Sequence, residues 1–445
     1  MGVYTTIDPA TGNQLAQFPE ISDAELDDLL ARSTEAYRQW RTTPLDKRRA
    51  VLERVAEIHR DRAGELARIL TMEMGKPITQ AEGEVALVAS IYRYYADHAE
   101  EFLADEPLEI SGPGTAVVRT EPIGPLVGVM PWNYPYYQVA RFAAPNLALG
   151  NTVVLKHARN CPQAALAIEK VFAEAGLPDG VYLNAFISSR QVATAIADPR
   201  IQGVSLTGSE KAGSAVGEVA GRHLKKCVLE LGGSDPFIVL RDADIDAAAT
   251  AAAVGRFANG GQACTASKRF LVEEPVFAEF VEKFLAAIES WQPGDPTEAA
   301  TKLGPLSSRS AVDELHELVQ DAVSRGARVL TGGERPEGDG AFYPPTVLTG
   351  VTREMRAYYE ELFGPVAVVH RVDSVDEAIE VANDSPFGLA SSVFTTDSAV
   401  AERVANELET GMVWINSTSK SSPDLPFGGI KRSGFGRELA RFGFA

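Results

Sequence analysis

The chain has 445 residues, of which 45% are apolar, and a formal net charge of −19. At ~100–200 residues per domain, this length predicts two to four domains with a sizeable core. The negative charge argues against nucleic acid or an anionic membrane as a partner. No apolar run approaches the ~18 residues of a membrane span, and the first residues lack the basic and apolar regions of a secretory signal, so we expect a cytoplasmic protein.

The three cysteines are Cys161, Cys227 and Cys264. None lies in a C-x-x-C pair, so we expect neither a zinc site nor a redox dithiol, and no metal is predicted. An odd number of cysteines fits a reducing compartment. One of them could serve as a nucleophile, although a buried structural cysteine is the commoner case.

The predicted elements begin with a helix, because Ser22 and Glu25 form a capping box and apolar residues then recur on one face. Further helices follow to about residue 104. Short apolar runs then alternate with helical stretches, which predicts a parallel α/β sheet from strands at 125–132, 152–156, 181–186 and 201–209. A second alternating set predicts strands at 236–240, 268–272, 365–372, 391–396 and 412–416. We place the boundary between the two units near Gly232-Gly233, and the segments 105–125 and 418–445 fit neither unit.

Polar residues stand where strands of the first unit end, which is the edge at which open α/β sheets bind ligands. Asn133, in PWNYP (131–135), could donate to a developing oxyanion or could be a turn residue. Lys156, in LKHAR (155–159), could bind a ribose or a phosphate, or could lie on the surface. Gly208 and Ser209, in SLTGSE (205–210), suit a pyrophosphate at a helix N-terminus, but Ser209 is equally a plain N-cap. The G-x-G-x-x-G fingerprint and the P-loop are both absent.

Two residues near the domain boundary suit catalysis. Glu230, in LELGGSDP (229–236), lies in a buried run, where desolvation would raise its pKa toward that of a general base; the alternative is a Glu paired with a cation. Cys264, in NGGQACTASKRF (259–270), follows two glycines in a loop that brings backbone N–H groups close to an accessible sulfur. By contrast, Cys227 reads as core and Cys161 has no such context.

Taken together and in order, these motifs resemble the aldehyde dehydrogenase superfamily over nearly the whole chain. The resemblance rests on IDPATG, TMEMGKP (71–77), PWNYP, LTGS, LELGG, GGQAC, EELFGPV (360–366) and PFGGIKRSGFGRE (426–438). It implies an α/β fold of three parts. These are a Rossmann-like cofactor domain without the usual glycine fingerprint (1–104 and 126–231), an α/β catalytic domain (232–417) and a small β oligomerisation element (105–125 and 418–445).

The resemblance also implies roles for the residues. Cys264 matches the nucleophile, Glu230 the general base, and Asn133 the oxyanion donor that works with the Cys264 N–H. The Cys264 thiolate would attack the aldehyde, hydride would pass to the nicotinamide, and Glu230 would activate the water that hydrolyses the thioester. The residues matched to cofactor binding are Trp132, Asn133, Lys156, His157, Ala158, Arg159, Gly208, Ser209, Leu231, Glu361 and Phe363. Retention of the three catalytic residues argues against an idle relative, and Glu230 disfavours an acyltransfer to coenzyme A.

The sequence is most similar to bacterial succinate-semialdehyde dehydrogenases, which implies a short acidic aldehyde as substrate. Arg141 matches an arginine that binds the substrate carboxylate, and Ser421 or Ser422 would add a hydroxyl. The alternatives are a surface role for Arg141 and a neutral or aromatic aldehyde as substrate. One departure is Ala258, where some members carry a second arginine; Arg256 or Lys268 would then have to compensate.

Cofactor and assembly follow from the same resemblance. NAD-selective members often carry an acid three residues after the ribose lysine, where this chain has Arg159, so NADP is favoured and NAD remains the alternative. We expect a homodimer or homotetramer. The chain stops at Ala445, before the strand that completes the oligomerisation sheet in family members, which would leave an edge unpaired.

Overall fold

The first helix forms where its capping box predicts. In the computed structural model, which describes residues 2–444, α1 spans Asp23–Trp40. The Ser22 hydroxyl accepts from the Glu25 N–H at 3.2 Å, while the Glu25 carboxylate accepts from the Ser22 N–H at 2.7 Å. Leu26, Leu29 and Leu30 are buried on one face, so the predicted helical periodicity is confirmed.

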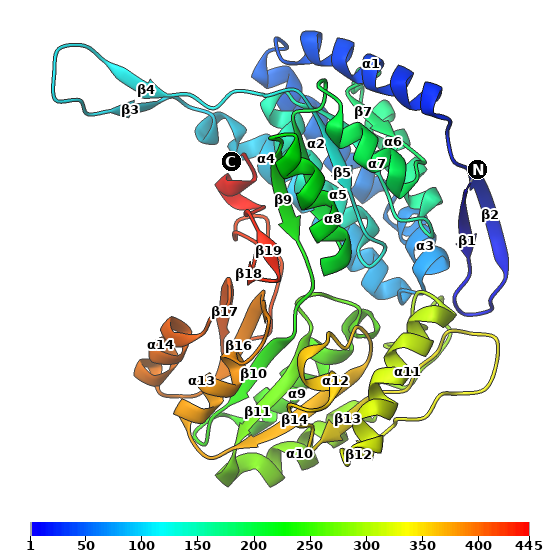
Figure 1. Ribbon diagram of the computed structural model, residues 1–445, viewed down its shortest axis with the longest axis vertical. Helices are drawn as coiled ribbons and strands as arrows, with labels where there is room; N and C mark the ends of the chain where they lie inside the picture. The colour runs from blue at the N-terminus through cyan, green and yellow to red at the C-terminus, as the bar shows by residue number, and fades with distance from the viewer. Residues whose placement is uncertain (1, 445) are drawn as a thin grey trace.

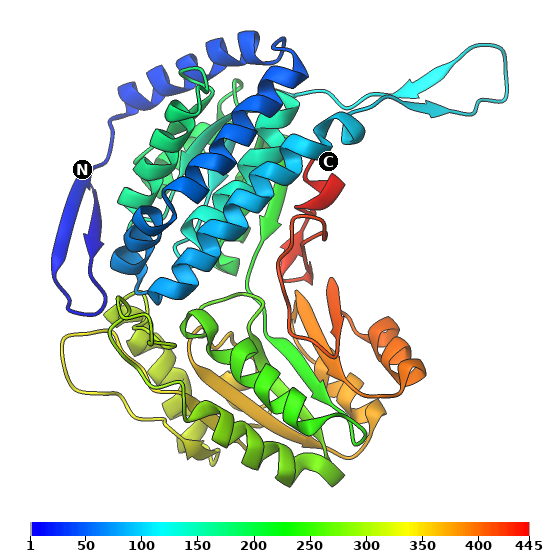
Figure 2. The ribbon, with the colours of Figure 1, turned by 180° about the vertical axis from the view of Figure 1, so that it is seen from behind.

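The chain divides into two α/β lobes (Figures 1 and 2). The upper lobe holds a six-stranded sheet in the order β19-β9-β8-β5-β6-β7, parallel except for β19. Its strands are β5 (Pro125–Val129), β6 (Thr152–Lys156), β7 (Tyr182–Asn184), β8 (Gly203–Thr207), β9 (Lys226–Glu230) and β19 (Gly434–Phe435). The four strands predicted from 125 to 209 are all present. They alternate apolar side chains, so that Val153 and Leu155 enter one core cluster and Val154 another.

Helices cover both faces of this sheet. One face packs against α2 (Leu45–Asp61), α3 (Ala63–Met74), α4 (Ile78–Phe102), α5 (Pro135–Leu149) and α6 (Pro162–Glu174). The other face packs against α1, α7 (Ser189–Ala197) and α8 (Glu210–Arg222). This three-layer arrangement contains the parallel α/β sheet that the alternating pattern predicts. Among residues 2–444, no helix has an apolar stretch long enough to cross a bilayer.

The lower lobe holds a seven-stranded sheet in the order β12-β13-β14-β11-β10-β16-β17, in which only β12 is antiparallel. Its strands are β10 (Asp235–Val239), β11 (Ser267–Glu273), β12 (Arg328–Thr331), β13 (Thr346–Thr349), β14 (Val366–Val372), β16 (Ala390–Phe394) and β17 (Met412–Ile415). The helices are α9 (Ile245–Phe257), η1 (Ala258–Gly261), α10 (Glu274–Ile288), α11 (Arg309–Ser324), α12 (Arg356–Tyr359), α13 (Val375–Asn383) and α14 (Ser398–Glu407). All five predicted strands of this unit are confirmed, whereas β12 and β13 were not predicted because their runs are short.

Three small pairings lie outside the large sheets. The strands β1 (Val3–Ile7) and β2 (Gln14–Pro19) form a hairpin at the N-terminus. The strands β3 (Glu106–Leu108) and β4 (Ala116–Val118) form a second hairpin, which projects from the upper lobe (Figure 1). The strand β15 (Phe387–Gly388) pairs with β18 (Ile430–Lys431).

The C-terminal segment therefore joins both lobes, because β18 pairs in the lower lobe and β19 pairs with β9 in the upper one. The residues between them include Ser433, which is fully buried. Its hydroxyl donates to the Gly232 carbonyl at 2.7 Å and accepts from the Gly388 N–H at 3.0 Å. The chain's own crossing from β9 to β10 lies beside it. After these crossings the short 3₁₀ helix η2 (Ala440–Phe444) follows.

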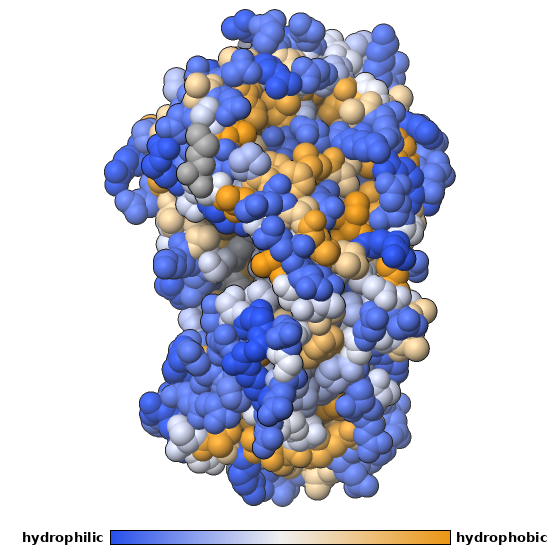
Figure 3. Space-filling view, turned by 90° about the vertical axis from the view of Figure 1, so that its right-hand side faces the viewer, coloured by the Kyte–Doolittle hydropathy of each residue, from blue (hydrophilic) through white to orange (hydrophobic). Residues whose placement is uncertain are grey.

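The strand order of the upper sheet creates a topological switch point. After β5 the chain adds β6 and β7 on one side, then returns to add β8 and β9 on the other. Such a switch point lies between the carboxyl ends of β5 and β8, and it is where open α/β sheets bind dinucleotides. The edge faces the lower lobe, and the two lobes meet at a narrower waist (Figure 3).

Candidate active site

Cys264 lies in a loop between η1 and β11, at the waist. Asn259, Gly260 and Gly261 have positive φ values of 53°, 64° and 71°, which glycine adopts without strain. This conformation brings the chain close to the loop after α12, since a Cβ on Gly261 would collide with the Gly364 carbonyl. The N-G-G sequence thus allows a tight loop that leaves Cys264 partly exposed.

The Cys264 side chain faces a cavity of about 170 Å³ between the lobes. Aromatic and small polar residues surround it: Leu87, Tyr134, Tyr137, Gln138, Ala263, Thr265, Ser419, Ser421 and Phe427. Burial raises the pKa of the Cys264 thiol to about 12, against the opposing effect of the positive charges of Arg141 and Lys268. The resting sulfur therefore carries its proton at neutral pH, and a base must remove it during reaction.

Asn133 is buried beside this loop. Its side-chain Nδ2 donates to the Gln262 carbonyl at 3.0 Å, so the amide lies next to the chain that leads into Cys264. Its own carbonyl accepts from Lys76 at 3.0 Å and from Asn259 at 2.9 Å. Three residues from two segments thus hold Asn133, which is what an oxyanion donor requires, because preorganised donors lower the barrier most.

A buried ion pair supports the Asn133 loop from behind. Lys76 and Glu84 form a salt bridge in which both side chains are fully buried. Glu84 also accepts from the Tyr136 and Tyr137 N–H groups at 2.9 and 3.1 Å, which caps the N-terminus of α5. Sequence analysis did not single out either residue, because a Lys and a Glu eight positions apart carry no distinctive signal.

Glu230 ends β9 and is buried, as predicted. Within residues 2–444, neither of its carboxyl oxygens has a hydrogen-bond partner. Burial raises the pKa of Glu230 well above its usual range; Arg141 opposes this shift and Glu438 adds to it. The desolvation predicted from the sequence is therefore present, and it favours the neutral form of the Glu230 carboxyl.

Arg141 is fully buried and forms an ion pair with Glu438. It also donates to the Thr207 hydroxyl at 3.1 Å and to the Tyr137 hydroxyl at 3.4 Å. It is not a wall residue of the Cys264 cavity but lies behind Tyr137. Direct contact of Arg141 with a substrate carboxylate therefore stays a prediction, and Arg141 does not line the cavity in this structure. Its positive charge opposes the rise that burial causes in the pKa values of Cys264 and Glu230.

The two predicted serines differ. Ser421 lines the Cys264 cavity and accepts a hydrogen bond from the Tyr137 hydroxyl at 2.9 Å. The Ser422 hydroxyl instead bonds to the Asp424 carboxylate and is not among the residues that line the cavity. Of the pair, the geometry supports Ser421 as the cavity hydroxyl.

A second cavity, on the other side of the Asn133 loop, holds predicted cofactor residues. Trp132, Glu361 and Phe363 all line it, and the rings of Trp132 and Phe363 pack edge to face with centroids 5.6 Å apart. Glu361 accepts from the Gly233 N–H at 3.1 Å. Two aromatic rings and a carboxylate on one cavity fit a nicotinamide riboside, whose ring stacks and whose ribose hydroxyls donate.

The LKHAR residues lie at the end of β6. The pKa of Lys156 falls to about 8 through burial, with the charge of Arg159 adding to this shift. The buried His157 accepts from the Ala158 N–H at 2.8 Å and makes a 3.0 Å bond with the Pro135 carbonyl, which ties this loop to the Asn133 loop. Arg159 forms an ion pair with Glu20 of the N-terminal hairpin.

The β8–α8 turn matches its prediction only in part. Ser209 caps α8 by accepting from the Ala212 N–H at 3.3 Å, so the plain N-cap reading holds. The sequence predicted that the Gly208 N–H is available to a pyrophosphate. In the structure it donates to the Glu230 carbonyl at 2.9 Å and is not free. Leu231 packs against Gly213 of α8, where a Cβ would lie 2.5 Å from it.

Comparisons with known proteins agree with this geometry. A model of the aldehyde dehydrogenase family matches residues 2–445. The chain belongs to the aldehyde dehydrogenase family. A succinate-semialdehyde dehydrogenase (NADP+) of Deinococcus radiodurans is 54% identical over 441 residues, which cover 99% of this chain and 92% of the relative. One from Mycobacterium avium is 45% identical over 98% of this chain and 93% of its own length. The crystal structure of succinic semialdehyde dehydrogenase from Streptococcus pyogenes with NADP+ superposes with a TM-score of 0.97 at 45% identity, covering 99% and 97% of the two chains.

Two cationic residues of this aldehyde dehydrogenase lie elsewhere than the sequence suggested. Arg256 and Lys268 were considered as compensating ligands for a substrate carboxylate. Both are fully buried, and neither is a wall residue of the Cys264 cavity. Arg256 donates instead to the carbonyls of Ser267, Gly261, Leu362 and Gly364.

The raised pKa of Cys264 predicts how the reactivity of this aldehyde dehydrogenase depends on pH. Because the thiol is the resting form and the thiolate is the nucleophile, alkylation of Cys264 by iodoacetamide will accelerate about tenfold per pH unit from about pH 7 to about pH 9. Mass spectrometry of the Cys264 peptide measures the rate and separates it from reaction at Cys227. A plateau below about pH 8 would contradict the raised pKa.

Proposed function

We propose that this aldehyde dehydrogenase oxidises succinate semialdehyde, or a similar short acidic aldehyde, to the carboxylic acid with NADP+. One observation carries the choice of substrate. The cavity that holds the Cys264 side chain also holds Ser421, at the end of a hydrogen-bond chain that starts at the Arg141 guanidinium. The names of the relatives above support the same choice.

The direction of this hydrogen-bond chain supports a carboxylate-binding role for Ser421. Arg141 donates to the Tyr137 oxygen, and the Tyr137 hydroxyl donates to the Ser421 oxygen. The Ser421 hydroxyl proton is then left to donate into the cavity, and each bond polarises the next. Because Glu438 balances the charge of Arg141, we propose that the carboxylate is recognised by this polarised hydroxyl and not by a bare cation.

The residues present support the catalytic roles. In the proposed reaction the Cys264 thiol loses its proton to solvent water, and the thiolate sulfur bonds to the aldehyde carbon as the carbonyl π bond breaks. Asn133 Nδ2 and the Cys264 N–H hold the resulting oxyanion. A nicotinamide held by Trp132, Glu361 and Phe363 would supply the hydride acceptor, and Cys264 would keep the oxidised product as a thioester. Glu230 then takes a proton from the water that attacks the thioester, which releases the acid and restores the thiol.

The cofactor would lie across the switch point between the carboxyl ends of β5 and β8. Trp132, Glu361 and Phe363 would hold the nicotinamide riboside, and Lys156 and Arg159 would face the adenosine ribose. Arg159 is a cation where an acid would select NAD, so it suits a 2′-phosphate after leaving Glu20. In this proposal 1–104 with 126–231 is the cofactor domain and 232–417 is the catalytic domain.

One observation favours the second candidate, a neutral or aromatic aldehyde. Leu87, Tyr134 and Phe427 line the cavity, and no lysine or arginine does so among the described residues. An aromatic substrate could pack on these rings. The volume of about 170 Å³ favours a short aldehyde over a bulky one.

We also propose that the protein is a cytoplasmic homodimer or homotetramer. The hairpin β3–β4 pairs only with itself and exposes apolar side chains, with Leu108 and Val117 51% and 52% exposed. The edge strand β17 of the lower sheet ends at Ile415, which is 47% exposed. A hairpin that leaves the body with apolar side chains on its surface suits pairing with a second copy of this chain.

The substrate proposal predicts the effect of breaking the hydroxyl chain. Tyr137→Phe and Ser421→Ala will each raise the KM for succinate semialdehyde about tenfold or more, since a hydrogen bond to a charged group is lost. The KM for butanal, a neutral aldehyde of equal length, will stay within about twofold. Ser422→Ala is the matched control and leaves both values unchanged. If both variants keep the wild-type KM for succinate semialdehyde, or if Cys264→Ser still reduces NADP+, the proposal is wrong.

The cofactor proposal predicts a selective effect of Arg159→Ala. Loss of the guanidinium will raise the KM for NADP+ about tenfold, because a charged hydrogen bond to the 2′-phosphate disappears, and will leave the KM for NAD+ nearly unchanged. Initial rates at 340 nm with each cofactor measure this. Equal changes for both cofactors would show that Arg159 does not read the phosphate.

The assembly proposal predicts that charge on the hairpin breaks the oligomer. Leu108→Glu with Val117→Glu will shift the molar mass measured by light scattering to that of the monomer, since buried carboxylates would oppose pairing. Val323→Glu, on the exposed face of α11, is the control with no change. An oligomer that persists in the double variant would rule out the hairpin as its contact.

A further inference from the structure

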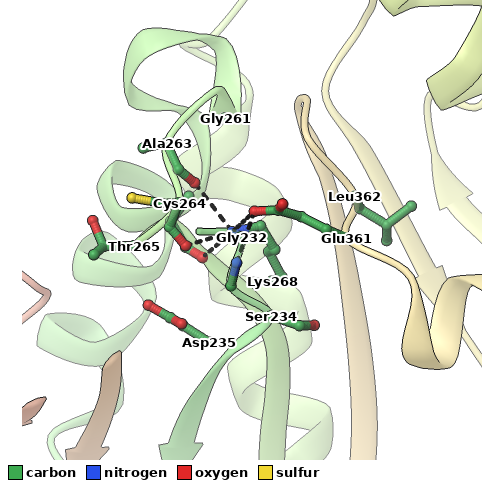
Figure 4. Close-up of polar contacts among 12 residues, drawn as sticks. Gly232, Ser234, Asp235, Gly261, Ala263, Cys264, Thr265, Lys268, Glu361 and Leu362 are labelled. Carbon is green, nitrogen blue, oxygen red and sulfur yellow. Dashed lines mark hydrogen bonds and ion pairs between the residues drawn. The ribbon is translucent and has the colours of Figure 1, made fainter. Parts of the chain in front are cut away.

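Lys268 is a buried cation that the proposed reaction does not use. It is the second residue of β11, 1% exposed, and its side chain turns back beneath the nucleophile loop (Figure 4). The Nζ donates to three carbonyls of this loop, those of Ala263 at 3.1 Å, Cys264 at 2.9 Å and Ala266 at 3.3 Å. All three acceptors lie within the four consecutive residues 263–266, which include the nucleophile.

The same ammonium group faces Glu361. Its Nζ lies 3.2 Å from Glu361 Oε1, and that oxygen also accepts from the Gly233 N–H. Gly233 is required at this contact, because a Cβ there would lie 2.5 Å from the Cys264 carbonyl oxygen. Lys268 therefore stands between the nucleophile loop and the carboxylate proposed to bind the nicotinamide ribose.

Peptide geometry gives the contact with Ala263 a consequence. The Ala263 carbonyl and the Cys264 N–H belong to one planar trans peptide, so they point in opposite directions. Lys268 and the Ala266 N–H, which donates to the same carbonyl at 3.1 Å, hold this peptide so that the Cys264 N–H points away from Lys268. Figure 4 shows the sulfur on that far side as well. Within residues 2–444, no acceptor takes the Cys264 N–H. This donor is left free for a ligand.

The neighbouring cation Arg256 shows how a residue that only stabilises the nucleophile loop differs from Lys268. Arg256 also joins the nucleophile loop to the loop after α12, through the carbonyls of Gly261, Ser267, Leu362 and Gly364. None of these carbonyls belongs to a peptide that includes Cys264. Arg256 thus closes the loop at its ends, whereas Lys268 binds both peptides that flank the nucleophile.

We propose that Lys268 is a positioning residue that aims the Cys264 N–H at the substrate oxygen and joins this oxyanion donor to Glu361 of the cofactor cavity. The inference rests on the proposed function, in which Cys264 is the nucleophile. The ammonium acts through the Ala263 peptide and touches neither substrate nor cofactor. A positive charge on that carbonyl also strengthens the N–H as a donor, because hydrogen bonds in a chain polarise one another.

The experiment compares two reactions of the same sulfur. Acylation by p-nitrophenyl acetate passes through an oxyanion, whereas alkylation by iodoacetamide, at a saturated carbon, does not. Both need the thiolate, so the ratio of the two rate constants at one pH cancels any change in ionisation. Lys268→Met will lower the acylation-to-alkylation ratio about tenfold or more, a fraction of the ~10²–10³ seen when an oxyanion donor is removed. Single-turnover p-nitrophenolate release and mass spectrometry of the Cys264 peptide supply the two rates.

The matched control is Arg269→Met, next along β11. Arg269 is an equally buried cation that donates to Ser234, Val381 and Ala382 carbonyls, none of them beside Cys264. Its loss will cost stability but leave the ratio within about twofold. Lys268→Arg, which keeps the charge and the donors, will recover part of the ratio. Should Lys268→Met fail to fold, Lys268→Gln carries the test with the same expected direction.

A ratio within about twofold of wild type in Lys268→Met, or in Lys268→Gln, overturns the inference. An equal fall in Arg269→Met overturns it as well, because general loosening would then explain the result. Cys264→Ser separates this outcome from failure of the proposed function. If that variant loses all NADP+ reduction while Lys268→Met keeps the wild-type ratio, the function stands and only the role of Lys268 is rejected.

Discussion

Irregular backbone buried between two lobes must have its carbonyl groups hydrogen-bonded, and in this protein buried cations supply many of the donors. The Cys264 loop is neither helix nor strand, so its carbonyls have no sheet or helix partners. Arg256 and Lys268 together take seven carbonyl contacts in and around it, and Lys76 takes the Asn133 carbonyl. Burying an unpaired charge is costly, so each cation remains where several acceptors converge. The rest of the site is arranged around this framework.

A second consequence is that the charges of the site are shared. Arg141 lowers the pKa of both Cys264 and Glu230, while burial raises both. Its ion pair with Glu438 keeps the interior close to neutral. The pKa of about 12 keeps the Cys264 thiol protonated at neutral pH, and Cys264 and Glu230 are not hydrogen-bonded to each other. In the proposed reaction the Cys264 thiol must therefore lose its proton before the sulfur can attack a carbonyl carbon.

Much of this organisation could be predicted from the sequence, because the strands and motifs concerned are encoded by short stretches of neighbouring residues. Strands read from apolar runs, such as Thr152–Lys156, formed with the predicted bounds, and the boundary at Gly232-Gly233 separates the two sheets. The motifs around Asn133, Glu230 and Cys264 led to the family, which the comparisons show. Their individual roles stay predictions until tested.

The rest depended on contacts between distant segments. Glu438 was read only as part of a motif, and nothing in its neighbourhood reveals Arg141 as its partner. Lys268 binds backbone carbonyls, which every residue has, so its contacts leave no pattern in the sequence. Ser421 and Ser422 are adjacent and alike in type, and only the direction of each side chain in the fold distinguishes them.

The C-terminal segment has a mechanical consequence. Chain crossings at β9–β10 and at β18–β19 lie side by side, and Ser433 bonds them to each other and to Gly388. Two adjacent tethers fastened by a buried hydroxyl leave little freedom for the lobes to swing apart, unlike enzymes that close a hinge over their ligands. The site between the lobes would then be nearly rigid, and in the proposed reaction the adjustments would fall to single side chains such as Arg159 and Glu361.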